Sequence, residues 1–204
     1  MPSLKNHYPP LEIGDIVFTC VAAFLFENIS RASLCWSNHV GIIVGYDGSD
    51  YIVAESKVPL SQTTSLTKFV NRSHHNHVAI KRLKQTLTDR QKLAIFSQVP
   101  GRLNIFYHTG FKYDSKRQFC SKFVYEIYKA AVNIELGKIE TFSQLLQTNP
   151  KADLIFWKLW FFGKIPWQRR TVTPASLWYC PKLETIYDSH PKITESFLKY
   201  QLNG

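Results

Sequence analysis

Residues 38–56, which read NHVGIIVGYDGSDYIVAES, carry the strongest fold signal in the chain. Residues 40–44 and 51–54 are rich in β-branched side chains, which is typical of neighbouring strands. Asp47-Gly48 between them is a strong turn signal. We therefore predict a β-hairpin whose reversal centres on residue 47.

This predicted hairpin brings a histidine and a carboxylate together. His39 and Glu55 are equidistant from residue 47, and opposed residues of an antiparallel pair share a face, with Cβ atoms roughly 5 Å apart. At that distance the carboxylate can accept a hydrogen bond from one imidazole nitrogen, which makes the other nitrogen a stronger base. A reversal centred between residues 48 and 49 would instead set Glu55 opposite Ile42.

The elements on either side of the hairpin favour an α+β domain. Residues 16–18 follow a Gly14-Asp15 turn and begin a buried strand, and residues 77–83 alternate as a third strand. Thr173-Pro174 suits the N-cap and first position of a short helix. The predicted strands come first and the predicted helices follow them, an order that favours α+β architecture.

Capping boxes mark the starts of three further predicted helices. In this motif a Ser or Thr stands three residues before a Gln or Glu. It occurs at Thr88, Ser115 and Thr141, each followed by Gln. The first helix should stop by Pro100 and the third before Pro150, because proline cannot continue a helix.

The composition predicts one globular domain spanning residues 1–204. The chain is 45% hydrophobic and 20% charged, enough to bury a sizeable core, and it has no evident linker or repeat. The apolar run 16–26 is too short to span a bilayer and lacks the flanks of a signal peptide. The four scattered cysteines are then expected to be free thiols in a reducing compartment. We predict a cytoplasmic protein.

The formal net charge of +10 raises the question of an anionic partner. Basic residues are spread along the chain, and no nucleic-acid-binding motif is present, so we predict no specific nucleic-acid partner. Weak contact with an anionic membrane surface or cell-wall material remains compatible with this charge. The oligomeric state is not readable from the sequence.

Cys120 is the best candidate for a reactive thiol. It lies near the predicted start of the helix that follows Ser115, just after Lys116 and Arg117. A helix N-terminus carries about half a positive charge, which favours the thiolate. Cys20 lies within an apolar run, where burial would keep the thiol protonated. On this context alone, a small core residue is the favoured interpretation of Cys120, as it is for most free cysteines.

A thiol nucleophile needs a base, and His39 is the best placed of the histidines. It stands at the entry of a strongly β segment, where a rigid backbone would fix its ring. His108 lies in a loop-like stretch and stays open as a site residue. The group at residues 74–77 has three histidines without a nearby Cys or carboxylate, so a polar loop that enters a strand is favoured over a metal site.

These residues also carry a family resemblance. Four segments occur in the same order as in the YiiX/YebB-like cysteine hydrolases, a branch of the NlpC-type permuted papain-like superfamily, and the chain resembles that family over nearly its whole length. The segments are Gly14–Phe18, Asn38–Ile42, Val53–Ser56 and Phe119–Val124.

The resemblance implies a permuted papain-like α+β fold, with an antiparallel sheet packed against helices and the cysteine at a helix N-terminus. It also implies a catalytic order of histidine, acidic residue and cysteine, which His39, Glu55 and Cys120 match. Many relatives carry an acidic residue after the Cys-Ser pair, where this chain has Lys122. That departure leaves the triad intact and changes the surface beside it.

The expected reaction is hydrolysis of an amide, with a thioacyl-enzyme intermediate. The backbone N–H of Cys120 and one further donor would hold the oxyanion, and Gln118 and Tyr113 are the candidates for that donor. This chemistry needs no cofactor and no metal. Amide-containing or acylated small substrates are all compatible, among them peptidoglycan-derived peptides and isopeptides.

An alternative is a lipid-binding or acyl-transfer protein of the lecithin:retinol acyltransferase type, which shares the permuted layout. It rests on the aromatic stretch at residues 156–162, with Trp167 nearby. Such a segment could line a groove for an acyl chain or rest on a membrane surface. A core helix packed against the sheet would explain the same residues.

Overall fold

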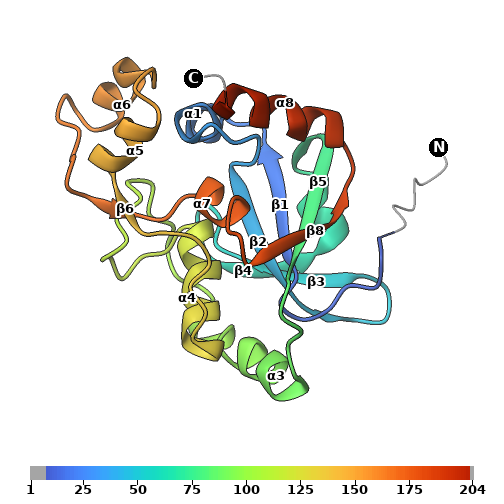
Figure 1. The fold of residues 1–204 in the computed structure, drawn as a ribbon. Helices are drawn as coiled ribbons and strands as arrows, with labels where there is room; N and C mark the ends of the chain where they lie inside the picture. The colour runs from blue at the N-terminus through green and yellow to red at the C-terminus, as the bar shows by residue number, and fades with distance from the viewer. Residues whose placement is uncertain (1–7, 203–204) are drawn as a thin grey trace.

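The protein is built around an antiparallel sheet. The computed structural model describes the backbone of residues 8–202 and the side chains of residues 8–196. Within that range six strands form the main sheet in the order β4-β3-β2-β1-β5-β8 (Figure 1). Their bounds are β1 Ile16–Val21, β2 His39–Tyr46, β3 Tyr51–Glu55, β4 Gln62–Ser65, β5 Ser73–Leu83 and β8 Leu183–Asp188.

Helices surround this sheet, and a short two-stranded ribbon lies apart from it. The helices are α1 Phe24–Ser33, α2 Leu66–Val70, α3 Asp89–Ser97, α4 Cys120–Val132, α5 Phe142–Thr148, α6 Leu154–Trp160, α7 Pro174–Trp178 and α8 Pro191–Leu202. The ribbon pairs β6 Glu140–Thr141 with β7 Arg170–Thr171, and the segment between these strands carries α5 and α6. Figure 1 shows α5 and α6 as a group at one side of the molecule.

Both faces of the sheet are buried, because side chains alternate along each strand. Ile16 and Phe18 of β1 point to the face covered by α4, together with Ile42 of β2. Val17 points to the opposite face, where Phe69 of α2 closes a second apolar cluster. α4 therefore packs directly against the central strands and carries Cys120 to the sheet.

Most of the elements expected from the sequence are present. The hairpin and the strands that begin at residue 16 and include residues 77–83 are confirmed, and the expected α+β class, with an antiparallel sheet packed against helices, is correct. Thr88 and Thr141 form complete capping boxes, and Thr173 caps α7 with Pro174 in its first turn. The expected order of strands before helices is wrong, because α1 precedes β2 and β8 follows α7.

The capping box expected at Ser115 is also wrong. The Ser115 hydroxyl accepts from the N–H of Arg117 in a turn, and the helix begins only at Cys120. The reason is tertiary: the N–H of Gln118 donates to the carbonyl of Phe106, and its carbonyl accepts from His108. Residue 118 is thus held in an extended ladder and cannot enter a helix.

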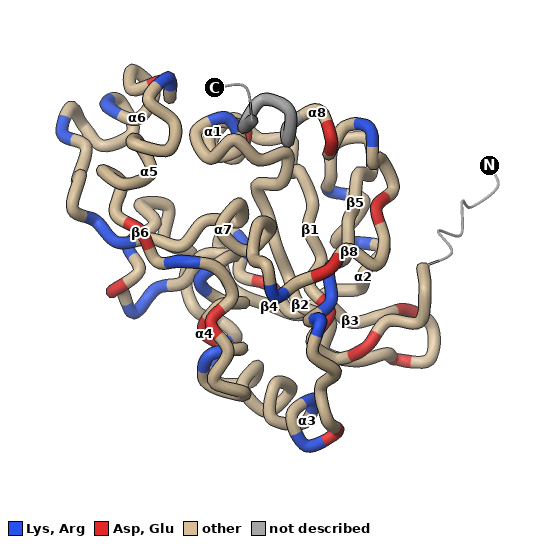
Figure 2. The backbone as a smooth tube through the Cα atoms, viewed as in Figure 1, with Lys and Arg blue, Asp and Glu red and all other residues tan. Residues whose placement is uncertain are grey.

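Charged side chains are distributed over most elements, as Figure 2 shows for Lys and Arg. α6 and the loop after it are among the segments that carry them. Of the helices in residues 8–202, none has both the length and the apolar character needed to cross a bilayer.

Candidate active site

Cys120 is the first residue of α4. Phe119 before it is extended (φ −144°, ψ 163°) and provides no side-chain cap, so the thiol sits where the backbone N–H groups of the first turn are exposed to it. The buried Lys122 side chain donates to the carbonyls of Ser115 and Arg117 and fixes the turn before the helix. The Ser121 hydroxyl donates to the carbonyl of Val172, 2.7 Å away.

A β-bulge sets the pairing of His39 with Glu55. Near the turn Tyr46 pairs with Tyr51, a register that would place Glu55 opposite Ile42 on the wrong face. The register shifts between Ile43 and Gly45, after which Ile42 pairs with Ala54. Glu55 is therefore opposite position 41 and returns to the face of His39.

The expected direct opposition of His39 and Glu55 is thus wrong, but the expected contact is present. The two residues are diagonal neighbours on one face, and their long side chains close the gap. The distance between His39 Nε2 and Glu55 Oε2 is 2.6 Å. Gly41 is opposite Glu55 and two residues after His39 on β2, and a Cβ there would come within 2.9 Å of Phe69. The absence of a side chain lets the Phe69 ring stack on the imidazole, with centroids 5.2 Å apart.

Glu55 is fully buried and has three polar partners. Its second oxygen, Oε1, accepts from Arg72 Nη2 at 2.6 Å and from Gln62 Nε2 at 3.4 Å. Burial alone would raise the pKa of this carboxyl, but the bonds from His39 and the Arg72 charge outweigh it and lower the pKa. Glu55 is therefore held as a carboxylate against the imidazole.

The structure brings Cys120 and His39 together, although 80 positions separate them in the chain. The Cys120 sulfur lies 3.9 Å from the carbonyl oxygen of Asn38, directly before His39. His39 uses Nε2 for Glu55, whereas Nδ1 is buried and has no hydrogen-bond partner within the described residues. Nδ1 is thus the free nitrogen of a ring that lies next to the thiol.

The electrostatics of this pair favour separated charges. Burial lowers the pKa of His39, but its interactions with Cys120 and Glu55 outweigh that and raise the pKa to about 9. Burial raises the pKa of Cys120, but the neighbouring imidazole outweighs it and the pKa is lowered. The raised pKa of His39 and the lowered pKa of Cys120 both favour a thiolate beside an imidazolium.

Tyr107 is a site residue that sequence reasoning missed. Its buried hydroxyl lies 3.9 Å from the Cys120 sulfur. Burial and the nearby sulfur raise the pKa of the phenol, whereas the backbone N–H of Cys120 acts in the opposite direction. The phenol thus remains a protonated donor beside both the thiol and this N–H. No sequence motif marks Tyr107, which lies in the loop-like stretch that contains His108.

The two predicted oxyanion donors occupy different surroundings. Gln118 is buried directly before Phe119 and Cys120, and its Oε1 has no partner among the described residues. The Tyr113 ring packs edge-on against Tyr125, with centroids 5.9 Å apart, and no contact in the described part of the chain joins Tyr113 to Cys120.

The other histidines are engaged elsewhere. His108 Nδ1 accepts from the N–H of Gly110 in a turn. His74 and His75 are exposed, whereas His77 is buried, with its Nε2 3.2 Å from Asp188. Across residues 8–202, no group of three or more His, Cys, Asp or Glu side chains is arranged to hold a metal ion.

The other cysteines offer no second reactive thiol. Burial raises the pKa of Cys35 to about 12 and also raises that of Cys20. Cys180 is buried, and it follows the end of α7 rather than beginning a helix. Cys120 differs from Cys20 and Cys35 because an imidazole compensates its burial.

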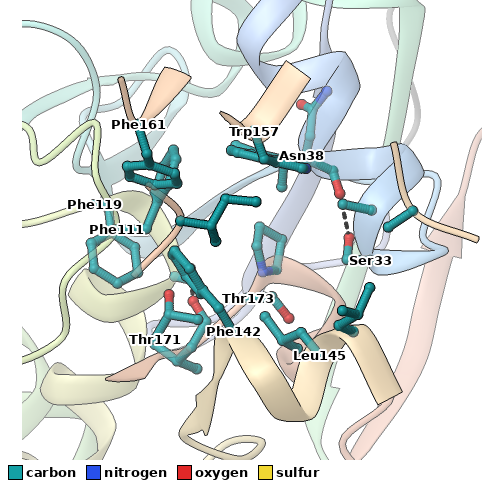
Figure 3. A pocket seen from close by; sticks show the side chains of 18 of the residues that line it. Ser33, Asn38, Phe111, Phe119, Phe142, Leu145, Trp157, Phe161, Thr171 and Thr173 are labelled. Atoms are coloured by element: carbon teal, nitrogen blue, oxygen red, sulfur yellow. Dashed lines mark hydrogen bonds between the residues drawn. The ribbon is translucent and has the colours of Figure 1, made fainter. Parts of the chain in front are cut away.

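An apolar pocket adjoins Cys120. Its volume is about 110 Å³, and its wall includes Cys120 and Asn38. α1, α5, α6 and residues 171–174 supply most of the remaining wall, and Figure 3 shows Trp157 and Phe161 on one side of the pocket and Phe142 and Leu145 on another. His39 and Glu55 do not line it.

Comparisons with known proteins agree with this architecture. Residues 10–187 match a family described as permuted papain-like amidase enzymes, YaeF/YiiX, C92 family. The uncharacterized protein YiiX of Escherichia coli K12 is 22% identical over 181 residues, which cover 88% of each chain. The crystal structure of YiiX from Escherichia coli O157:H7, described there as a metalloprotein, superposes with a TM-score of 0.80 at 21% identity. That alignment covers 87% of this chain and 97% of that one, and supports the fold.

Proposed function

Since the chain belongs to the permuted papain-like amidase family, we propose that it hydrolyses amide bonds, with Cys120 as nucleophile. His39 is the general acid and base, and Glu55 orients it. The observation that carries this proposal is a helix-terminal thiol that lies 3.9 Å from the carbonyl oxygen of Asn38, next to a histidine whose Nε2 is bonded to a buried carboxylate.

In the first half-reaction the Cys120 thiolate attacks the amide carbonyl carbon, and a carbon–sulfur bond forms. The carbonyl oxygen becomes an oxyanion that accepts from the Cys120 N–H and the Tyr107 hydroxyl, both of which lie at the sulfur. The carbon–nitrogen bond then breaks as His39 donates its proton to the departing amine. The product is a thioacyl-enzyme with neutral His39.

In the second half-reaction neutral His39 removes a proton from water, and the hydroxide attacks the thioester carbon. The carbon–sulfur bond breaks, the acid is released, and the thiolate–imidazolium pair is restored. Glu55 stays ionised throughout because Arg72 and Gln62 bind its second oxygen. Its role is to hold the ring orientation and to stabilise the imidazolium.

Acyl transfer is the second candidate function. It shares the first half-reaction and differs only in the acceptor, which would be an alcohol or amine in place of water. The apolar pocket beside Cys120 supports an acylated substrate in either case.

Labelling with iodoacetamide, followed by peptide mapping, tests the nucleophile. The wild type should be alkylated at Cys120 faster than at Cys20, which is partly exposed but has a raised pKa. Cys120→Ala should abolish both the fast phase and amide hydrolysis, whereas Cys20→Ala should leave both intact. A fast phase that persists in Cys120→Ala would refute the assignment.

A further inference from the structure

α6 carries apolar side chains on an inner and an outer face. Asp153 caps the helix by accepting from the N–H of Ile155 at 2.9 Å. Trp157 is on the inner face and lines the pocket that contains Cys120 (Figure 3). Ile155 and Leu159, which are four residues apart and therefore neighbours on the helix surface, are 74% and 75% exposed. The outer face of α6 thus leaves apolar side chains in solvent.

Phe162 extends this outer face beyond the end of α6. Its backbone is left-handed (φ 52°), a conformation that bulky residues rarely adopt, and it is 98% exposed. Two backbone bonds hold the turn: the N–H of Phe162 donates to Leu159 at 3.1 Å, and the N–H of Gly163 donates to Lys158 at 2.6 Å. The fold therefore fixes an apolar ring in solvent on a strained backbone, which points to a role outside the packing of this chain.

α1 contributes a fourth exposed apolar side chain. Phe24 is 71% exposed, and its ring contacts that of Phe156 edge-on, with centroids 5.3 Å apart. This contact places Phe24 beside α6. Gathered apolar side chains, unlike scattered ones, mark sites that bind a partner or a membrane. We call these four side chains the α6 surface: Phe24, Ile155, Leu159 and Phe162.

Basic side chains accompany the α6 surface. Lys151, Lys158 and Lys164 are exposed, and Figure 2 shows basic residues on α6 and on the loop after it. The one acidic residue in this stretch of sequence is Asp153, whose carboxylate already caps the helix. α1 adds one acidic and one basic exposed residue, which offset each other. The charge around these apolar side chains is therefore positive.

This combination of apolar side chains and positive charge favours an anionic membrane over other partners. A second copy of the chain would bring the same lysines against one another in a two-fold interface, and the chain has a formal net charge of +10. A nucleic acid would pair with the lysines but would leave the apolar side chains in water. An anionic bilayer satisfies both, because apolar side chains enter the acyl boundary while lysines stay among the headgroups.

We propose that the α6 surface docks on an anionic lipid membrane, with the outer face of α6 in the headgroup region. Docking does not depend on amide hydrolysis, since none of the four side chains belongs to the proposed catalytic groups. Trp157, on the inner face of the same helix, lines the pocket that contains Cys120. A docked molecule would therefore hold its candidate active site close to the membrane.

Co-sedimentation with vesicles tests the docking with the full-length protein. The wild type should pellet with equimolar phosphatidylcholine and phosphatidylglycerol, and less with phosphatidylcholine alone. Leu159→Ser/Phe162→Ser should lower the partition coefficient on the anionic vesicles by about 100-fold, the scale of two apolar side chains that no longer enter the bilayer. Cys120→Ala should pellet like the wild type, because docking uses no catalytic group.

Leu93→Ser/Phe96→Ser is the matched control for the apolar part. It makes the same changes at positions that are 66% and 46% exposed on α3, which Figure 1 shows far from α6. This variant should pellet like the wild type. A wild-type midpoint of urea denaturation in both double variants separates a loss of docking from a loss of folding.

Lys158→Gln tests the electrostatic part. It should bind anionic vesicles about fivefold more weakly, which corresponds to ~1 kcal/mol for one lysine at an anionic surface, and neutral vesicles as the wild type does. Lys68→Gln, at an exposed position of α2, is the matched control and should change neither. Salt at about 1 M should weaken binding to anionic vesicles, because the Debye length falls to about 3 Å.

Two results would overturn membrane docking by the α6 surface. One is a wild-type protein that stays in the supernatant with both vesicle types. If that protein also sediments as a dimer that Leu159→Ser/Phe162→Ser dissociates, the surface belongs to a second copy of the chain. The other result is equal pelleting of the α6 and α3 double variants. Equal pelleting of the wild type with neutral and anionic vesicles would overturn the part assigned to the lysines.

Discussion

The central sheet carries two histidine–carboxylate pairs within the described residues, and one of them, His39–Glu55, lies beside the helix-terminal Cys120. His39 binds Glu55 at 2.6 Å and stacks on Phe69. His77 lies 3.2 Å from Asp188 and stacks on Trp36, with centroids 3.8 Å apart. Both histidines are nearly inaccessible, at 2% and 4% exposure. The two pairs are alike in composition and in the burial of the histidine, although Glu55 is fully buried and Asp188 only partly.

They differ in what surrounds them. Nδ1 of His39 is free, and its ring lies next to the helix-terminal thiol of Cys120. In the other pair, Asp188 also accepts from the Thr194 hydroxyl and the backbone N–H of His190, so the pair ties the start of α8 to the sheet. A buried histidine–carboxylate pair is therefore no sign of catalysis by itself. The His39–Glu55 pair is distinguished by a third group, the Cys120 thiol, which the distant helix α4 supplies.

The largest expected effect separates the two histidines. His39→Asn removes the general acid and base and should lower kcat/KM for amide hydrolysis by about 100-fold to 10,000-fold. His77→Asn should leave kcat/KM unchanged and lower the free energy of unfolding by about 1–3 kcal/mol, because Asp188 loses a buried partner. Steady-state kinetics and urea denaturation measure the two effects. Equal losses of activity in both variants would contradict the distinction.

A smaller effect is expected at Tyr107, which has no counterpart beside His77. Tyr107→Phe removes one oxyanion donor and should lower kcat by about 100-fold, the lower end of what such a donor contributes. The KM should change little, because the hydroxyl acts mainly on the oxyanion. Tyr113→Phe is the control, since its ring packs against Tyr125, and it should keep wild-type kcat. A wild-type kcat in Tyr107→Phe would exclude this role.

The smallest effect compares the carboxylates. Glu55→Gln should lower kcat/KM at neutral pH by about tenfold, the scale of one pKa unit, and Asp188→Asn should leave it unchanged. In the wild type, activity should fall as pH rises through about 9, where His39 loses the proton that it donates. Glu55 raises the pKa of His39, so in Glu55→Gln this alkaline limb should move to lower pH. A pH–rate profile measures it.

On the acid side of the pH–rate profile, activity should change in the opposite direction with pH. Activity should fall as pH decreases through the lowered pKa of Cys120, because the thiolate becomes protonated. In His39→Asn the compensating cation is lost and burial dominates, so iodoacetamide labelling of Cys120 should require alkaline pH. Labelling of that variant at acidic pH with the wild-type rate would show that the imidazole does not lower the thiol pKa.

Local signals in the sequence predicted the parts of the fold that depend on neighbouring residues. The capping boxes at Thr88 and Thr141 are correct because the bonds join residues three apart. The same motif at Ser115 failed, because pairing of Gln118 with residues 106 and 108 outcompetes the local cap. β8 and α8 carry no comparable local signal and were not predicted.

The His39–Glu55 contact shows the same limit more sharply. The hairpin was predictable from its β-branched runs and its turn, but the register was not. The turn sets a register that separates the two side chains, and the bulge between Ile43 and Gly45 reverses that outcome. Both strands at the bulge are packed on two faces, so the position of the extra residue depends on packing across the whole sheet.

By itself the sequence determined the hairpin, the helix that carries Cys120 and, through the order of its motifs, the permuted papain-like fold. The hairpin and the helix follow from local propensity and periodicity, which act over a few residues, whereas the permuted papain-like fold was implied by the family resemblance. Only the tertiary structure decided that the Tyr107 hydroxyl and an apolar pocket lie next to the Cys120 sulfur. It also decided that His39, and not His77, is the histidine next to that sulfur. Those facts depend on which distant segments pack together, and the free energy of that packing is shared among many side chains, so no short motif records it.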